Sequence, residues 1–438
     1  MQINAGDTCF MLIASALVLL MTPGLALFYC GMVKKKNVLN TIMMSFIVLG
    51  VLTIQWVMFG YSLAFGKDIH GFIGSLNWFG LNGVGLEPNE DYAATIPHLV
   101  FMVFQMMFAL ITAALISGAV VERMRFSAYI VIIVAWSTFV YDPLVHWVWG
   151  AGGWLKEMGV LDFAGGTVVE MASGVSALVL AMLLGKRKTA GGQLIVPHNL
   201  PLTVLGAALL WFGWFGFNAG SALAANEVAA SAFVATQIAG GAATVSWALV
   251  EFIHHGKPTM LGVVSGCIAG LVAITPACGF VTPIAALIIG LLVSPIAYYA
   301  VSELKTRLGY DDTLDVFGLH GISGTFGTIA TGVFATKAVN PAGANGLLYG
   351  NAHQLLIQLI SVGATWALSI IATVVIFKVV SSFMEVRVTE DEEVTGLDLI
   401  EHGENAYNTD DVLGIPVGIP LRPVVGTNIA TNPVAESV

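Results

Sequence analysis

Residues 162–174 read DFAGGTVVEMASG, and the apolar stretch continues to Leu184, directly before the basic sequence GKRK at 185–188. Between Ala164 and Leu184 the one ionisable side chain is that of Glu170. About 20 apolar residues suffice for an α-helix to cross a bilayer, and an acid near its centre costs about 2.5–3.5 kcal/mol. The stretch therefore predicts a transmembrane helix in which Glu170 has a function that offsets this cost.

The composition indicates a polytopic membrane protein. The chain has 438 residues, of which 57% are hydrophobic and 10% are charged, whereas soluble domains carry about 25% charged residues. The net charge of −10 does not point to a partner, because much of the acid lies in a hydrophilic C-terminal tail, and no basic face suggests nucleic acid. The four cysteines are far apart and are expected to be small buried hydrophobic residues, without a disulfide or a metal site.

Apolar runs of membrane-spanning length divide the chain into eleven predicted helices. The N-terminal sequence MQINAGDTCFMLIAS lacks the basic segment and the small-residue cleavage site of a signal peptide, so we expect the first run to be a retained helix. The predicted spans are 8–32, 41–65, 97–121, 127–149, 164–184, 198–221, 228–253, 260–276, 281–303, 316–335 and 353–380.

The lysines and arginines predict the orientation. With the N-terminus outside, 14 of them lie on the cytoplasmic side, and Lys67, Lys156 and Lys337 are the 3 outside. Because cytoplasmic loops carry an excess of Lys and Arg, this count predicts an outer N-terminus and a cytoplasmic C-terminus.

An odd number of helices allows two five-helix halves of opposite topology, at about 8–184 and 198–335, followed by a long last helix at about 353–383. Residues 1–384 would then form the transmembrane domain, and 385–438 a cytoplasmic tail. Inverted repeats are a common transporter plan in which the site lies near the midplane between the halves. The last helix of each half carries ionisable residues, Asp162 and Glu170 in one, Asp315 and His320 in the other.

The repeat makes Glu170 and His320 natural partners. In a narrow, dry passage such a pair would titrate as one coupled unit. The alternative for His320 is a structural hydrogen bond to a neighbouring helix. Asp162 begins its helix, where it is either a plain N-cap or an added negative field at the mouth of a cation path.

Aromatic side chains gather in three predicted spans. Phe104 and Phe108 share one helical face, WFGWFGFNAG at 211–220 is rich in rings, and Trp147 and Trp149 end the fourth span. Interfacial tryptophans usually anchor a helix in the membrane. The functional alternative is that ring faces bind a small cation and that bulky rings close a pore.

Five segments carry a resemblance to a known family. They are DFAGGTVV (162–169), WFGFNAGSA (214–222), GLVAITPACG (270–279), DDTLDVFGLHG (311–321) and HGENAY (402–407). In this order, across about residues 8–410, they resemble the signature segments of the Amt/MEP/Rh ammonium transporter family. The resemblance implies a homotrimer in which each protomer has its own pore through eleven helices related by a pseudo-twofold axis.

The resemblance also implies roles for single residues. Phe104, Trp149 and Ser221 match the outer ammonium site, Phe108 and Phe217 match two stacked rings that gate the pore, and Asp162 matches the acid that orients the pore. His320 matches the second of two paired pore histidines.

One residue departs from the family pattern. The motif normally ends in a histidine at the position of Glu170, and some fungal members are similar to this chain in having an acid there. We hypothesise that ammonium is recruited outside and deprotonated, and that ammonia crosses an apolar pore while the proton moves through a Glu170–His320 relay. Net transport would then be electrogenic.

Several alternatives stay open, among them an ammonium sensor and an electroneutral gas channel. A membrane enzyme lacks support, because the sequence has no nucleophile motif, metal-ligand spacing or cofactor loop. His254 and His255 could suggest a metal, but their position at a predicted cytoplasmic helix end favours dipole capping.

The C-terminal tail also resembles a segment of the family. EVTGLDLIEHGENAY at 393–407 resembles the family's regulatory tail, which couples protomers and responds to PII-type signal proteins. Residues 412–438 lack periodicity and are expected to be mobile or loosely docked. We expect a multi-pass protein of the inner (plasma) membrane, surrounded by lipid, without a cofactor. Ammonium and ammonia are its expected substrates, with methylammonium left open.

Overall fold

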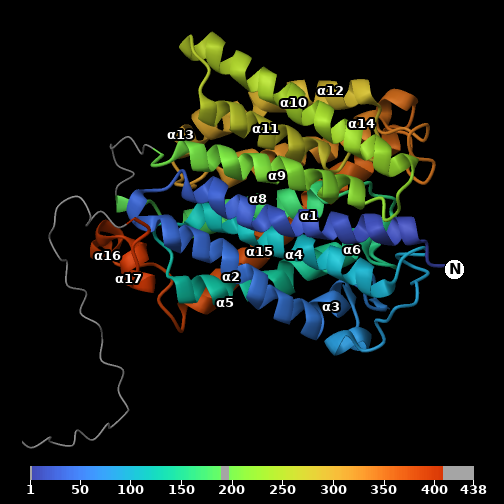
Figure 1. Ribbon diagram of the computed structural model, residues 1–438, viewed down its shortest axis with the longest axis horizontal. Coiled ribbons are helices and arrows are strands. Elements are labelled where there is room, and N and C mark those ends of the chain that lie inside the picture. Colours follow the sequence, from blue (N-terminus) through green and yellow to red (C-terminus); the bar gives the residue numbers. More distant parts are fainter. Residues whose placement is uncertain (1, 189–196, 408–438) are drawn as a thin grey trace, which may run out of the picture.

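The computed structural model describes residues 2–188 and 197–407. It shows a bundle of long helices that run roughly side by side (Figure 1). The N-terminus lies at one end of the bundle and the short helices α16 and α17 lie at the other (Figure 1). These are called the N-terminal end and the tail end below. The prediction for residues 412–438 falls outside the described residues.

Nine helical stretches of the described chain are long and apolar enough to cross a membrane. They are Ala5–Cys30, Lys35–Phe65, His98–Val120, Phe126–Glu157, Gly166–Leu184, Leu200–Gly220, Glu227–His255, Pro283–Leu308 and Ala352–Ser381. Each overlaps one predicted span, which confirms a helical chain with several apolar spans.

The two remaining predicted spans are also helical but shorter or less apolar. The 260–276 span contains α11 (Met260–Ile274), and the 316–335 span contains the π-helical turn η8 (Phe317–Ile322) and α14 (Ser323–Phe334). Eleven membrane crossings and their orientation therefore stay predictions. The helices without interruption are α1 (Ala5–Cys30), α4 (His98–Val120), α9 (Leu200–Gly220), α10 (Glu227–His255) and α15 (Ala352–Ser381).

Several long stretches contain a π-helical turn, a local widening that is often found at functional sites. These stretches are α2–η2–α3 (Val38–Gln55, Trp56–Gly60, Tyr61–Phe65), α5–η4–α6 (Phe126–Trp136, Ser137–Tyr141, Asp142–Trp149), η5–α8 (Gly166–Met171, Ala172–Leu184) and α12–η7–α13 (Pro283–Tyr299, Ala300–Leu304, Lys305–Leu308). Nothing in the hydropathy pattern distinguishes them from regular α-helix.

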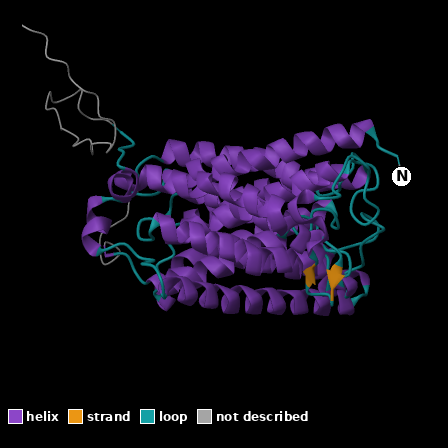
Figure 2. Ribbon diagram, turned by 90° about the horizontal axis from the view of Figure 1, so that it is seen from below, coloured by secondary structure: helices purple, strands orange, loops and turns teal. Residues whose placement is uncertain are grey.

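Short elements cover the two ends. The hairpin β1–β2 (Asp68–Ile69, Ile73–Gly74) pairs antiparallel and lies near the N-terminal end (Figure 2). The remaining short elements are η1 (Lys35–Asn37), η3 (Leu76–Leu81), α7 (Trp154–Glu157), η9 (Leu347–Tyr349), α16 (Glu390–Thr395) and α17 (Leu397–His402).

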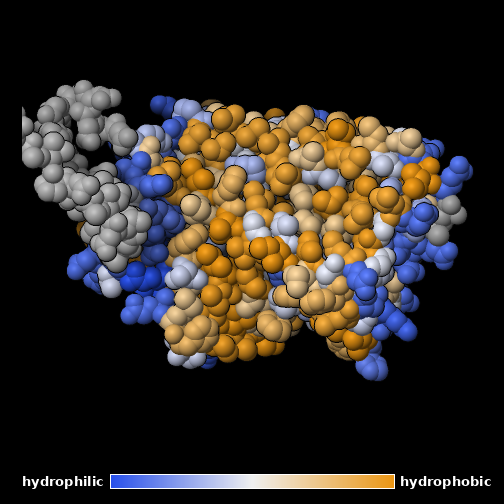
Figure 3. Space-filling view, turned by 60° about the horizontal axis from the view of Figure 1, so that its bottom comes forward, coloured by the Kyte–Doolittle hydropathy of each residue, from blue (hydrophilic) through white to orange (hydrophobic). Residues whose placement is uncertain are grey.

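The surface matches a protein that lies in a bilayer. Apolar residues form a broad band around the middle in the view of Figure 3, and hydrophilic residues gather at both ends. Large side chains such as Ile54, Phe139 and Ile371 are 67%, 63% and 64% exposed on the helices. Cys9 is exposed on α1, whereas the other three cysteines are buried, so the expectation of burial was wrong for Cys9.

Glycines allow the first helices of the two predicted halves to pack closely. A Cβ atom added to Gly206 of α9 would lie 2.2 Å from the backbone nitrogen of Phe28 on α1, and one added to Gly213 would lie 2.3 Å from Met21. Small residues permit such close backbone approach between membrane helices. The last helices of the halves, η5–α8 and η8–α14, also pack on each other, and this contact carries the site.

Candidate functional site

Glu170 and His320 form a direct contact in the interior. Glu170 lies on η5 and His320 on η8, and Glu170 Oε2 is 2.6 Å from His320 Nδ1. The residues are 1% and 2% exposed. At this distance a proton lies between the two atoms, either as imidazole N–H donating to a carboxylate or as a carboxylic acid donating to the imidazole. The sequence-based pairing is therefore present in the structure.

Glycine backbones set this distance. A Cβ atom added to Gly174 of α8 would lie 2.1 Å from the backbone nitrogen of Gly321, and one added to Gly324 would lie 2.9 Å from Cβ of Glu170. The two helices therefore cross with their backbones almost in contact. This crossing holds the two ionisable side chains against each other.

Asp162 caps the first turn of the Glu170 helix. Its Oδ1 accepts the backbone N–H of Gly165 at 2.9 Å, and its Oδ2 accepts those of Thr167 and Val168 at 2.9 and 3.3 Å. The first N–H groups of a helix lack partners within it, and a carboxylate satisfies them well. Asp162 thus caps this helix with its side chain from three residues before the N-cap residue, Gly165.

The His320 helix has an equivalent cap that the sequence analysis overlooked. Asp312 Oδ2 accepts the backbone N–H of Phe317 at 2.8 Å, and Asp312 precedes His320 by the same eight residues that separate Asp162 from Glu170. This equal spacing was a readable signal. The residue singled out instead, Asp315, has a left-handed φ of 60° and pairs with Lys305 Nζ at 2.7 Å.

Two phenyl rings stack as expected for a gate. The ring centroids of Phe108 and Phe217 are 4.1 Å apart with an interplanar angle of 20°. Phe104 meets Phe108 edge-on at 4.9 Å, but it is fully buried and its ring lies against Gly220. Phe104 therefore packs between Gly220 and the Phe108 ring and supports the position of that ring.

A cavity of about 300 Å³ lies beside these rings at the N-terminal end. Trp149, Ser221 and Asp162 line it, whereas Phe104 does not. The Trp149 indole N–H donates to the carbonyl oxygen of Asp162 at 2.8 Å, and the Ser221 hydroxyl donates to the carbonyl oxygen of Phe217 at 2.8 Å. Further lining residues that the sequence analysis did not place here include Tyr92, Phe101, Gln105 and Lys156.

Residues 9–407 match the family model described as the Ammonium Transporter Family. The chain belongs to this family. It is 57% identical over 402 residues to an ammonium transporter of Bacillus subtilis (strain 168), with 92% of this chain and 98% of the relative covered.

Two solved structures have a similar fold. The crystal structure of Saccharomyces cerevisiae Mep2 matches with a TM-score of 0.84 at 36% identity, covering 90% of this chain and 89% of Mep2. A protein titled "Sensor Amt Protein" matches with a TM-score of 0.84 at 30% identity, covering 91% and 98%. With this family and its apolar spans, the chain is an integral multi-pass membrane protein.

The family match extends through the tail helices, which dock on the tail end of the bundle. Arg125 forms a bidentate ion pair with Glu392, with Nη1–Oε1 at 2.9 Å and Nη2–Oε2 at 2.8 Å. Arg387 donates to the carbonyl oxygens of Leu184 and Lys186 at 2.6 and 2.7 Å. The tail therefore holds the segment that directly follows the Glu170 helix.

A buried ion cluster is centred on Arg187, which belongs to this same segment. Arg187 bonds Asp311 through two nitrogens and Glu122 through a third, with Nη1–Oε2 at 2.5 Å for the latter. Burial alone would raise the pKa of Asp311, but hydrogen bonds and charge from Arg187, with the charge of Arg123, lower it to about 2. Burial opposes the charge of Arg187 at Glu122 as well, and the net effect there is also a lowered pKa.

Asp142 is another buried acid that the sequence analysis did not single out. Asp142 is fully buried at the start of α6, where its Oδ2 accepts an N–H of Gln55 at 2.7 Å. Asp142 lies inside the apolar run that predicts the span 127–149, and the prediction of that span did not consider its charge.

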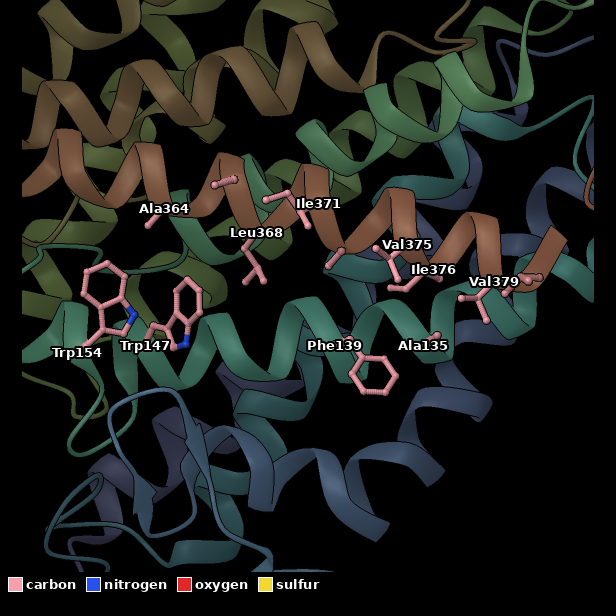
Figure 4. A pocket seen from close by; sticks show the side chains of 13 residues that line it. Ala135, Phe139, Trp147, Trp154, Ala364, Leu368, Ile371, Val375, Ile376 and Val379 are labelled. Carbon is pink, nitrogen blue, oxygen red and sulfur yellow. The ribbon is translucent and has the colours of Figure 1, made fainter. Parts of the chain in front are cut away.

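A larger cavity of about 650 Å³ lies apart from this site, between α15 and the α5–α6 stretch (Figure 4). Trp147 and Trp154 lie at one end, and aliphatic side chains such as Leu368 and Val379 continue along it (Figure 4). None of its lining side chains carries an oxygen that could accept an N–H group of ammonium, in contrast to Ser221 in the smaller cavity.

The histidine pair at the end of α10 has structural partners. His255 Nε2 is 2.8 Å from the Tyr298 hydroxyl, and both His254 and His255 are exposed. The residues that the structure describes contain no group of three or more His, Cys, Asp and Glu side chains that could hold a metal ion.

Proposed function

We propose that this protein transports ammonium across the membrane, with Glu170 and His320 as the proton-carrying pair of its pore. The observation that carries the proposal is the buried 2.6 Å contact between these two side chains in a chain of the Ammonium Transporter Family. The stacked rings of Phe108 and Phe217 support it, since they are the gate that the family resemblance implies.

Ammonium would be recruited in the cavity at the N-terminal end. The Trp149 ring face can attract a small cation, and the Ser221 oxygen can accept one of its N–H groups. Phe104 lies behind Phe108 in the wall, so its proposed contribution to this site acts through the position of Phe108. Asp162 contributes by fixing the start of the Glu170 helix.

The apolar pore would then select by protonation state. An ammonium ion loses most of its hydration in a dry passage at high cost, whereas neutral ammonia does not. Potassium is excluded because it has no proton to release. The proton released by ammonium passes through the Glu170–His320 pair, which makes net transport electrogenic.

The proposal includes the assembly and its orientation. The N-terminal end faces outwards and the tail end faces the cytoplasm of a cell whose inner (plasma) membrane holds the protein, with eleven crossings in two inverted repeats. The Lys and Arg count supports this orientation. A homotrimer and a PII-type partner at the tail end rest on the family resemblance alone.

Ammonium-elicited currents in proteoliposomes on solid-supported membranes test the proposal. The wild type is expected to give a current whose pH profile differs from that of Glu170→His, because the substitution replaces a carboxyl group with a second imidazole. Identical profiles would remove the special role of the acid. Intact ammonia flux without any current would favour an electroneutral gas channel.

Truncating the acid tests its necessity. Glu170→Ala is expected to lose the ammonium current or its selectivity against potassium, since His320 then lacks its partner. A full and selective current in this variant would show that the acid is dispensable. Gly363→Ala on α15 is a suitable control, because nothing lies within 4 Å of the added Cβ atom.

Sensing is the second candidate function. The similarity to the sensor Amt protein and the docked tail favour it, because a sensor must pass a change in the pore to the tail end. A protein that binds ammonium and changes its tail contacts, but carries neither current nor ammonia, would fit a sensor.

A further inference from the structure

Lys156 of α7 brings a positive charge into the cavity where ammonium is proposed to bind. It lines this cavity together with Tyr92, Trp149 and Ser221. A lysine in a cation-recruiting cavity is unexpected, because like charges repel and its ammonium group would disfavour a second cation nearby.

The ammonium group of Lys156 uses the same kinds of contact that an ammonium ion would use. Its Nζ donates to the carbonyl oxygen of Trp149 at 2.9 Å and lies 5.6 Å from the centre of the Tyr92 ring. Among the described residues no carboxylate comes within ion-pair distance of Lys156. Its direct contacts are therefore an oxygen and a π face, while the charges of Asp91 and Glu157 act on it from beyond ion-pair distance.

The ring that Lys156 approaches is held rigidly. The Tyr92 hydroxyl donates to the carbonyl oxygen of Phe65 at 2.8 Å and accepts the N–H of Ala151 at 2.9 Å. Its ring also stacks on Phe101 with 5.1 Å between centroids. Because Tyr92 is fixed, its ring face is a preformed cation contact, as a selective site requires.

We propose that Lys156 is a tethered competitor of the substrate, whose side-chain ammonium occupies the Tyr92 face and the Trp149 carbonyl until an incoming ammonium ion displaces it. This inference rests on the proposed function and adds a specificity-determining residue and a second aromatic contact to its outer site. The consequence is a weakened apparent affinity, so that the site fills only at higher ammonium concentrations.

Four variants test this in the current assay with full-length protein. Lys156→Met keeps the side-chain length without charge, Lys156→Gln keeps an N–H donor for Trp149 without charge, and Lys156→Arg keeps the charge. Lys67→Met removes another lysine from the same end of the bundle, away from the cavity lining. The measured quantities are the half-saturating ammonium concentration and the maximal current.

The two neutral variants are expected to lower the half-saturating concentration about two- to fivefold, the range of one exposed cation–π contact. The maximal current should not change, and Lys156→Arg and Lys67→Met should behave as wild type. A wild-type value for Lys156→Gln, or a raised value for both neutral variants, overturns the inference, because Lys156 then only positions Trp149. Absence of any ammonium response in the wild type would instead refute the proposed function, and this inference with it.

Discussion

The segments Asp162–Glu170 and Asp312–His320 have the same construction but different chemistry. In each, an aspartate accepts the backbone N–H five residues later, a π-helical turn follows, and an ionisable side chain reaches the interior eight residues after the aspartate. They differ in that one ends in an acid and the other in an imidazole. The backbone plan is thus shared, while the relay residue is free to vary.

The two caps are not equally strong. Asp162 accepts three backbone N–H groups, whereas Asp312 accepts one, and its Oδ1 has no partner among the described residues. Charged residues gather instead around the second segment, where Lys305 pairs with Asp315 and Arg187 with Asp311. One helix start is therefore held by its own carboxylate, and the other also by neighbouring ion pairs.

Removing the caps gives the largest expected effect. Asp162→Ala should lower the free energy of unfolding by about 4 kcal/mol, because three buried N–H groups lose a charged acceptor. Asp312→Ala should lower it by about 1–2 kcal/mol. Denaturant titration in detergent measures both, and equal losses would contradict the difference between the caps.

Widening the helix crossing should have the next largest effect. Gly174→Ala places a methyl group against the backbone of Gly321, which cannot move aside as a flexible side chain would. We expect a loss of about 3 kcal/mol in the free energy of unfolding together with a weaker ammonium current. Gly363→Ala, where the new methyl group meets nothing within 4 Å, should instead stabilise the protein by about 0.5–1 kcal/mol. A Gly174→Ala variant as stable as this control would show that the crossing is not tight.

The ion pairs beside the second segment predict a smaller effect that depends on pH. Because the pKa of Asp311 is lowered to about 2 in the folded protein, its stabilisation is complete above pH 4 and disappears as pH falls through 2. Asp311→Asn should cost about 2 kcal/mol at pH 7. The difference from wild type should shrink between pH 4 and pH 2 in thermal unfolding measured in detergent. A difference that does not change over this range would contradict the assigned ion pairs.

Hydropathy alone located the helices, because the thickness of a bilayer imposes a length on every apolar run. It could not locate the π-helical turns, which depend on packing between helices and leave the residue pattern unchanged. Eleven crossings stay a prediction for a different reason, because α11 and the η8–α14 stretch are helical but short or rich in glycine.

The pairing of Glu170 with His320 could be predicted from the proposed repeat. Other parts of the site became visible only in the three-dimensional structure. Asp312 was missed although its spacing to His320 equals that of Asp162 to Glu170. Phe104 shares a helical face with Phe108, but only packing shows that it supports that ring from behind. The sequence places Lys156 only on the outer side of the membrane. Its contact with the Tyr92 ring depends on how the outer loops fold, which the sequence pattern does not show.

The glycine crossing also bears on how this pore could change during evolution. The separation of positions 170 and 320 is set by the backbones of Gly174, Gly321 and Gly324, and not by the two side chains that meet there. A single codon change at either position can therefore alter the proton chemistry while both helices stay where they are. Substitutions at these two positions can therefore arise during evolution without a change in the packing of the helices.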